Sequence, residues 1–317
     1  MIGRVAAVTD PGRTRRHNED AYVIEPPLFA IADGMGGAQA GEVASRLATA
    51  ALKEARANDG GEQRIADLIQ EANRRVYDRS SSDPNTSGMG TTITVALVED
   101  DRVAFGHVGD SRAYLIRDAQ MEQLTEDHSL VNELLKTGKL SREEAEVHPQ
   151  RSVITRALGT DPDVDVDTFS VRAEQGDLFL LCSDGLTDMV SEQSILDVVE
   201  RHRDDIDDAL RALVKAANRG GGQDNITVVA FEIADGVPAS DGDTLEQALP
   251  IGDDEDTLTE ADGVPAIDDT AVVSVDEIQA VARSTRRRHL RRRLLAWVVI
   301  LVLVVAVALL LYLRFVR

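Results

Sequence analysis

Three apolar runs in this chain each end on an aspartate beside a glycine, and this pattern constrains the fold more than any other feature. The runs are Leu28 to Ala32 before Asp33-Gly34, Val103 to Val108 before Gly109-Asp110, and Leu178 to Ser183 before Asp184-Gly185. A fourth aspartate, Asp224, precedes the apolar run Ile226 to Phe231. Short apolar runs bounded by turn residues predict buried strands. We therefore expect a sheet-rich core with four carboxylates at strand ends.

The remaining sequence alternates between groups of strands and pairs of helices. Strands are predicted over 5–8, 21–24, 28–32, 91–98, 102–108, 112–116, 152–158, 164–171, 177–183 and 226–233. Helices are predicted over 43–54, 65–76, 129–137, 192–199 and 205–218. The short turns between residues 91 and 116 predict three antiparallel neighbours. Runs of strands separated by helix pairs indicate an α+β layered domain over residues 1–234 rather than a doubly wound fold.

Charge is distributed in blocks after this domain. The net charge of -22 argues against a nucleic-acid partner, because a phosphate backbone would be repelled. Residues 235–282 contain fourteen Asp or Glu and no Lys or Arg, which predicts a disordered acidic linker. Residues 283–293 contain seven Arg and no acid. This basic segment is predicted to lie beside a membrane and to contact anionic lipid headgroups.

An uncharged run of twenty residues, 294–313, follows the basic segment. As a helix it is long enough to cross about 30 Å of hydrocarbon, whereas a buried core helix would normally keep one polar face. We therefore predict a single C-terminal transmembrane helix. The preceding arginines place the N-terminal domain in the cytoplasm by the positive-inside rule, so a cell-membrane protein with one span is expected.

The residues at the strand ends offer oxygen donors of the kind that Mg²⁺ and Mn²⁺ prefer, without the Cys and His spacing of a zinc site. Several carboxylates at one point need cations, because like charges raise one another's pKa. Two divalent ions sharing a water could generate a hydroxide for in-line attack on phosphorus. The single cysteine, Cys182, lies within an apolar run and is interpreted as a core residue.

Several polar residues stay ambiguous on their own. Either Arg15 or Arg16 could grip a phosphate in bidentate fashion, or remain solvated. The cluster Asn18-Glu19-Asp20 could be an ordinary turn. Asp110 could cap a hairpin turn ahead of Ser111 as readily as bind a metal.

Six motifs together resemble the metal-dependent protein phosphatases of the 2C type, and the likeness covers roughly residues 3–233. The motifs are Arg15-Arg-His-Asn-Glu-Asp20, Asp33-Gly-Met-Gly-Gly37, Gly90-Thr-Thr92, Gly109-Asp-Ser-Arg112, Ser183-Asp-Gly185 and Gly222-Gln-Asp-Asn225. The chain is most similar to bacterial Ser/Thr phosphatases that pair with membrane Ser/Thr kinases. The resemblance implies a four-layer sandwich of two antiparallel β-sheets flanked by helix pairs.

The resemblance also implies roles for individual residues. Two Mn²⁺ or Mg²⁺ ions would be held by Asp33, the Gly34 carbonyl, Asp184 and Asp224, with Glu19 acting through water. Arg15 rather than Arg16 would grip the phosphate, and Asp20 would orient the attacking water. A third metal would be bound by Asp110, with Ser152 as its partner in a flap. Met35 stands where many eukaryotic relatives carry a histidine acid, so metal-bound water is the expected proton source.

The implied activity is hydrolysis of phosphoserine and phosphothreonine in proteins, by a monomer that opposes membrane kinases. An inactive, phosphoprotein-binding adaptor is the alternative, although intact Arg15, Asp33, Asp184 and Asp224 argue against it. A second alternative is a membrane scaffold whose C-terminal segment carries the function.

Overall fold

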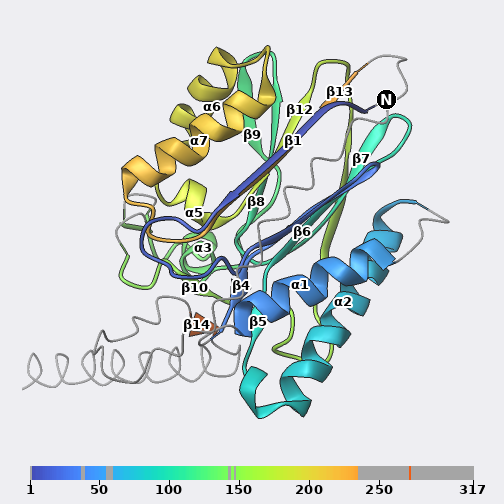
Figure 1. Ribbon diagram of the computed structural model, residues 1–317, viewed down its shortest axis with the longest axis vertical. Helices are drawn as coiled ribbons and strands as arrows, with labels where there is room; N and C mark the ends of the chain where they lie inside the picture. Colours follow the sequence, from blue (N-terminus) through green and yellow to red (C-terminus); the bar gives the residue numbers. More distant parts are fainter. Residues whose placement is uncertain are drawn as a thin grey trace, which may run out of the picture. The chain divides into compact units, whose positions relative to one another are not determined.

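Two antiparallel five-stranded sheets form the centre of the fold (Figure 1). The computed structural model describes residues 2–36, 40–54, 60–141, 144–145, 148–234 and 271–272. The first sheet has the order β1 (Ile2–Asp10), β13 (Ile226–Ile233), β12 (Leu178–Cys182), β8 (Arg112–Arg117) and β9 (Gln120–Gln123). The second has the order β11 (Asp167–Arg172), β7 (Arg102–Val108), β6 (Ile93–Val98), β3 (Leu28–Ala32) and β2 (Ala21–Glu25).

Two smaller pairings complete the strands. The short strands β4 (Gly34–Met35) and β5 (Gly90–Thr91) pair antiparallel next to Asp33. The strand β10 (Val153–Ile154) pairs in parallel with β14 (Ala271–Val272). Residues 271–272 are the only described part of the linker predicted at 235–282.

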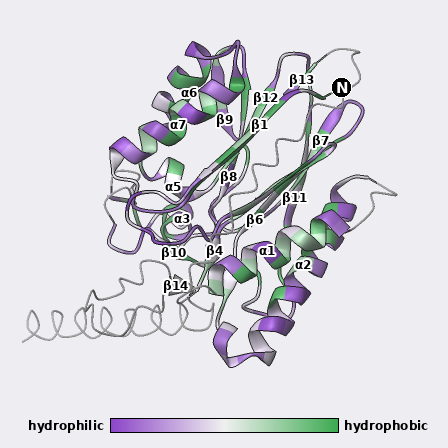
Figure 2. Cartoon of the chain, in the orientation of Figure 1, coloured by the Kyte–Doolittle hydropathy of each residue, from purple (hydrophilic) through white to green (hydrophobic). Residues whose placement is uncertain are grey.

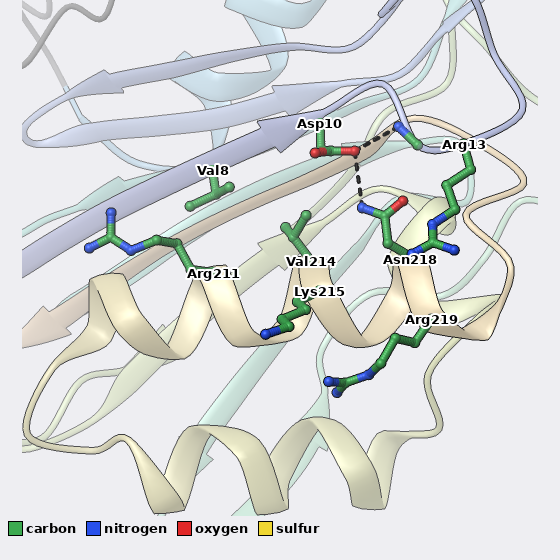
Figure 3. Close-up of a pocket in the computed structure, with 9 residues that line it drawn as sticks. Val8, Asp10, Arg13, Arg211, Val214, Lys215, Asn218 and Arg219 are labelled. Atoms are coloured by element: carbon green, nitrogen blue, oxygen red, sulfur yellow. Dashed lines mark hydrogen bonds between the residues drawn. The ribbon is translucent and has the colours of Figure 1, made fainter.

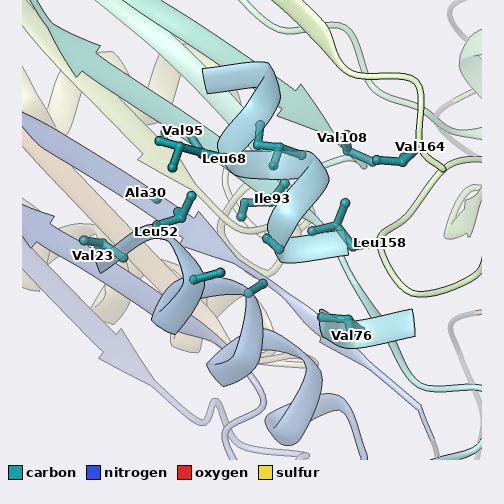
Figure 4. Close-up of a cluster of buried hydrophobic side chains, with 14 of the residues drawn as sticks. Val23, Ala30, Leu52, Leu68, Val76, Ile93, Val95, Val108, Leu158 and Val164 are labelled. Carbon is teal, nitrogen blue, oxygen red and sulfur yellow. The ribbon is translucent and has the colours of Figure 1, made fainter. Parts of the chain in front are cut away.

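A pair of helices covers each sheet, which gives the predicted four layers. The apolar faces of α1 (Ala40–Glu54) and α2 (Glu62–Ser82) pack on the second sheet, as Figure 4 shows for Leu52 and Leu68. Those of α6 (Glu192–Arg201) and α7 (Ile206–Gly220) pack on the first. Hydrophobic and hydrophilic bands alternate along these helices (Figure 2), as amphipathic elements require. The shorter helices are η1 (Pro84–Thr86), α3 (Leu130–Lys136) and α5 (Asp184–Thr187).

The strands are continuously apolar because each central strand is buried on both faces. In β12, Phe179 and Leu181 point between the sheets, whereas Leu178, Leu180 and Cys182 point toward α6 and α7. This alternation follows from the two-residue period of a strand. Cys182 is fully buried and its pKa is raised to about 12 by burial, which confirms it as a core residue.

One predicted pairing is wrong. Strands β6 and β7 pair antiparallel, but β8 pairs with β12 and β9 in the other sheet. Gly109, with φ of +117°, begins the corner that carries the chain from one sheet to the other. Asp110 therefore does not cap a hairpin. The physical reason is burial. One face of β8 packs between the two sheets and the other packs toward α6, and pairing next to β7 would not bury both faces.

Other boundaries also differ from the prediction. The strand predicted over 152–158 is limited to Val153–Ile154, and the one predicted from residue 164 starts at Asp167. The strand predicted over 5–8 extends over Ile2–Asp10 and pairs with the distant β13. The basic segment 283–293 and the apolar run 294–313 lie outside the described residues. Among the residues that are described, no helix is long and apolar enough to cross a membrane.

Candidate active site

The predicted carboxylates come together where strands of both sheets end. Asp33 follows β3, Asp110 follows β7, and Asp184 is the first residue of α5 after β12. Asp224 and Asp20 precede β13 and β2. These five side chains interact electrostatically: the negative charges of Asp20, Asp184, Asp224 and Asp110 all act on Asp33. The site is thus built by the two sheets jointly.

The backbone around Asp33 is held by the Gly90-Thr91-Thr92 segment. The Asp33 amide donates to Thr92 Oγ1 at 3.0 Å, and the Asp33 carbonyl accepts from the Thr92 amide at 2.9 Å. Thr91 Oγ1 donates to the same carbonyl at 2.8 Å. These bonds fix the direction in which the Asp33 carboxylate leaves the strand.

Gly34 is required by close packing. A Cβ at this position would lie 2.2 Å from the Gly41 carbonyl oxygen and 2.5 Å from that of Glu19. The Gly34 amide also donates to the Glu19 carbonyl at 3.2 Å. The first turn of α1 and the Glu19 backbone can therefore approach the turn after β3 only because residue 34 has no side chain.

Asn225 organises the loop that carries Arg15 and Glu19. Its side-chain oxygen accepts from the Glu19 amide at 2.8 Å. Its side-chain nitrogen donates to the carbonyls of Pro11 at 3.0 Å and His17 at 2.9 Å. The sequence motif contains Asn225, but its role as the support of this loop becomes visible only in the structure, because its partners lie more than 200 residues away.

Arg15 lies at the cluster, whereas the Arg16 side chain is exposed. The role of Arg15 in binding phosphate stays a prediction. Arg15 Nη2 contacts Asp224 Oδ2 at 2.8 Å. Burial disfavours the charged guanidinium, but the carboxylates of Asp224, Asp33 and Glu19 outweigh it and raise the pKa of Arg15. The Asp224 carboxylate is the anion that Arg15 binds here.

Asp20 is oriented by the neighbouring strand ends. Ser183 Oγ donates to Asp20 Oδ2 at 3.0 Å and accepts from the Thr227 amide at 3.0 Å. Asp20 Oδ1 and Asp184 Oδ1 are both buried and have no hydrogen-bond partner among the described residues. Buried carboxylate oxygens without donors are costly, and a bound cation would satisfy them.

The carboxylates are difficult to ionise together. Burial, together with the nearby negative charges, raises the pKa values of Asp33 and Asp184 well above the ordinary range for aspartate. Burial likewise raises the pKa of Asp20 to about 6 and those of Glu19 and Asp110 to about 7. Positive charge at this site would lower all of these pKa values.

The residues present fit divalent cations by chemistry and by their unsatisfied oxygens. In their positions here, no three His, Cys, Asp or Glu side chains of the described residues converge tightly enough to hold one ion. Arg15 instead neutralises part of the cluster through Asp224. The side chains of the cluster offer only oxygen donors, which is the ligand chemistry that Mg²⁺ and Mn²⁺ prefer.

Not every predicted residue joins the cluster. Ser152 precedes β10 and makes no hydrogen bond to Asp110 in the described structure, so its role as a ligand stays a prediction. Its neighbour Arg151 pairs with Asp188 at 3.1 Å. Asp188 was missed from the sequence, although its charge acts on both Asp110 and Asp184. The spacing Asp184-x-x-x-Asp188, one helical turn, was the available signal.

Comparison with known proteins gives the family. The family model described as Protein phosphatase 2C matches residues 13–242. The chain is 41% identical over 236 residues to the serine/threonine phosphatase Stp of Listeria innocua, covering 71% of this chain and 93% of that protein. It is 38% identical over 313 residues to the serine/threonine protein phosphatase PstP of Mycobacterium tuberculosis, covering 97% of this chain and 60% of PstP.

A solved structure supports the same assignment. The catalytic domain of PstP, crystallised in complex with two manganese ions, superposes with a TM-score of 0.68 at 37% identity. The match covers 74% of this chain and 99% of that domain. Both sheets, both helix pairs and the carboxylate cluster lie within residues 2–234. The chain therefore belongs to the protein phosphatase 2C family.

Proposed function

We propose that this chain, a metal-dependent protein serine/threonine phosphatase by its family and relatives, hydrolyses phosphoserine and phosphothreonine at the carboxylate cluster. The observation that carries the proposal is the pair of unsatisfied buried oxygens on Asp20 and Asp184, set among further carboxylates and beside Arg15. An inactive adaptor would not need to maintain so many destabilising buried acids. The Stp and PstP relatives are both named as Ser/Thr phosphatases.

Two Mn²⁺ or Mg²⁺ ions are the proposed cofactors, as in the manganese complex of the PstP catalytic domain. Asp33, the Gly34 carbonyl, Asp184 and Asp224 would hold them, with Glu19 contributing through water. Asp110 would hold a third ion, with Ser152 as its partner. When bound, the ions supply the positive charge that makes a water nucleophilic at neutral pH.

The protein's own side chains position the reactants. Arg15 binds two non-bridging oxygens of the phosphoester. The phosphate then replaces the Asp224 carboxylate as the partner of the Arg15 guanidinium. Asp20 presents its free Oδ1 to the attacking water while Ser183 holds Oδ2, so the water's lone pair is directed at phosphorus opposite the leaving oxygen. Met35 is buried against Ile154 and Ala157 and cannot protonate the leaving group, which leaves water as the proton donor.

The cellular setting is also a proposal. The arginines at 283–293 and the uncharged run at 294–313 support a single-pass cell-membrane anchor with a cytoplasmic catalytic domain. A monomer fixed there would meet phosphorylated membrane Ser/Thr kinases, their protein substrates and anionic lipid. Such confinement raises the encounter rate with membrane-bound partners without any added contact.

Turnover of a phosphothreonine peptide tests the proposed chemistry. We expect hydrolysis that requires added Mn²⁺, stops with chelator, and falls at least about 100-fold in Asp33→Asn and Arg15→Ala, because charge stabilisation of the transition state is lost. Asp163→Asn removes an exposed carboxylate outside the site and should leave the rate unchanged. A folded protein that binds Mn²⁺ without hydrolysing the peptide would favour the adaptor.

A further inference from the structure

A groove with four basic side chains lies beside α7, outside the carboxylate cluster (Figure 3). It has a volume of about 550 Å³. Its basic side chains are Arg13, from the loop after β1, and Arg211, Lys215 and Arg219, from α7. Val8 and Val214 contribute apolar contacts. We call this surface the α7 groove.

The positive charge of the α7 groove is largely unpaired. Arg13, Lys215 and Arg219 have no carboxylate partner among the residues that the structure describes. Arg211 has only a 3.6 Å contact with Asp208, in which both side chains are more than half exposed. Such a pair contributes little. In a chain of net charge -22, this concentration of free cations is unusual and attracts anions.

The one acid in the α7 groove is already engaged. Asp10 Oδ1 accepts from the Gly12 amide at 2.8 Å and from Asn218 Nδ2 at 3.0 Å, bonds that Figure 3 marks. Asp10 therefore fixes the loop to α7 rather than pairing with the groove's cations. It leaves them available to an external ligand.

The spacing along α7 explains how the groove forms. Arg211, Lys215 and Arg219 are four residues apart and so lie on one face of the helix. The opposite face buries residues such as Leu210 and Leu213 against the sheet. Favourable interaction with the helix dipole could account for a cation in the last turn, such as Arg219. It does not account for Arg13, which the loop brings to the same place.

The loop that supplies Arg13 to the α7 groove also supplies Arg15 to the catalytic site. The amides of Arg13 and Thr14 donate to the Gly222 carbonyl at 2.8 and 3.2 Å, which anchors the loop. Two residues further on, Arg15 reaches Asp224. Because two residues of chain span at most about 7 Å, the Cα atoms of Arg13 and Arg15 are close neighbours. One cation of the groove is therefore carried by the same loop as the arginine of the catalytic site, at most about 7 Å away along the backbone.

We propose that the α7 groove binds an acidic segment of the phosphoprotein substrate, in which Asp, Glu or a second phosphorylated residue lies about two to five positions from the phosphoester under attack. An extended peptide advances about 3.3 Å per residue, so two residues of substrate cover the distance of at most about 7 Å between the Cα atoms of Arg15 and Arg13. The inference rests on the proposed phosphatase function and adds a substrate preference to it. Because one loop carries both Arg13 and Arg15, the occupant that we propose is a substrate rather than the chain's own acidic linker or a lipid surface.

The test compares three substrates on the full-length chain. These are a phosphothreonine peptide with Glu at the flanking positions, the same peptide with Gln there, and p-nitrophenyl phosphate. The groove variant combines Arg211→Gln, Lys215→Gln and Arg219→Gln, all at exposed positions. The matched control combines Arg74→Gln, Arg102→Gln and Arg172→Gln, which makes the same charge change on α2, β7 and β11.

We expect kcat/KM of the groove variant on the acidic peptide to fall about tenfold, mainly because KM rises. A loss of this size is what removing three exposed ion pairs would cause. The loss should shrink in high salt. Turnover of the Gln peptide and of p-nitrophenyl phosphate should stay within about twofold, and the control should retain the preference for the acidic peptide. Failure of the wild type on all three substrates would instead reject the phosphatase function itself.

Three results would overturn the proposal while leaving the phosphatase function intact. One is equal kcat/KM of the wild type for the acidic and Gln peptides. Another is faster turnover of the Gln peptide by the groove variant, which would mean that the acidic linker occupies the α7 groove. The third is a groove variant that no longer binds vesicles containing anionic lipid but keeps the wild-type preference for the acidic peptide. That result would assign the groove to the membrane.

Discussion

At the scale of single residues, Gly34 ties the fold to the chemistry. We expect Gly34→Ala to destabilise the domain by about 3 kcal/mol and to abolish activity, because the new Cβ would meet two backbone oxygens that cannot move independently. Urea unfolding and peptide hydrolysis measure the two effects. Gly88→Ala is the control: its Cβ would meet no atom, so only the strain of φ +78° remains, at about 1 kcal/mol. Equal costs at the two positions would contradict the packing argument.

His107 provides a pH-dependent contribution away from the carboxylates. It is fully buried between Thr94 Oγ1 at 3.0 Å and the Glu126 carbonyl at 3.1 Å. Burial, assisted by His128, lowers its pKa from 6.5 to about 3. Between these values the unfolded chain binds one proton more than the folded protein. The free energy of unfolding therefore falls as pH decreases, by about 1.4 kcal/mol per unit from this residue alone.

Replacing this histidine should flatten the pH dependence. We expect His107→Gln to lower the stability at pH 7 but to reduce the slope of unfolding free energy against pH by about one proton between pH 4 and 6. Denaturant unfolding at several pH values measures this slope. Parallel slopes for the wild type and the variant would mean that His107 is protonated in the folded protein.

The sequence indicates candidate site residues, but it does not indicate which residues hold them in place by hydrogen bonds. Asp33, Asp184 and Asp224 end or begin apolar runs, and in the structure they lie at the ends of strands, as that local signal predicts. Asn225 and Ser183 act through hydrogen bonds to residues far away in the chain. No local pattern reveals such partners, because they depend on which strands become neighbours.

At the scale of elements, an aromatic stack joins the two sheets. The ring centroids of Phe29 and Phe231 lie 4.2 Å apart, and those of Phe179 and Phe231 lie 5.2 Å apart. We expect Phe231→Ala to cost about 3–5 kcal/mol, since a large buried side chain leaves a cavity between stiff sheets. Tyr22→Ala, at a site 37% exposed, should cost far less. Thermal unfolding compares the two, and a similar loss at both positions would argue against a rigid core between the sheets.

The elements were predictable where burial is regular and unpredictable where the chain changes sheets. Successive side chains of β12 point alternately into two hydrophobic cores, so every residue of the strand is apolar and the run can be recognised in the sequence. The corner at Gly109 looked like a hairpin, because a short turn between two strands has the same local composition in both cases. Long-range pairing of β8 with β12 decided between them.

At the scale of the whole molecule, the candidate active site and the predicted membrane anchor occupy separate parts of the chain. Both sheets, both helix pairs and the carboxylates of the candidate active site lie within residues 2–234. The acidic linker, the arginine segment and the uncharged run all follow residue 234. Catalysis should therefore depend on the first part, and location in the cell on the second.

Ending the chain at residue 240 separates these two properties. We expect the shortened protein to keep kcat and KM on a soluble phosphothreonine peptide within about twofold, because it retains every element of the site. After carbonate extraction of cell membranes, the full-length protein should remain in the membrane fraction and the shortened one should not, since about twenty uncharged residues suffice to hold a helix in a bilayer. Replacing the seven arginines at 283–293 with Gln controls for surface charge: it should weaken the cytoplasmic orientation without releasing the protein. Release of the full-length protein by carbonate would show that its membrane contact is electrostatic, and the predicted helix at 294–313 would have to be abandoned.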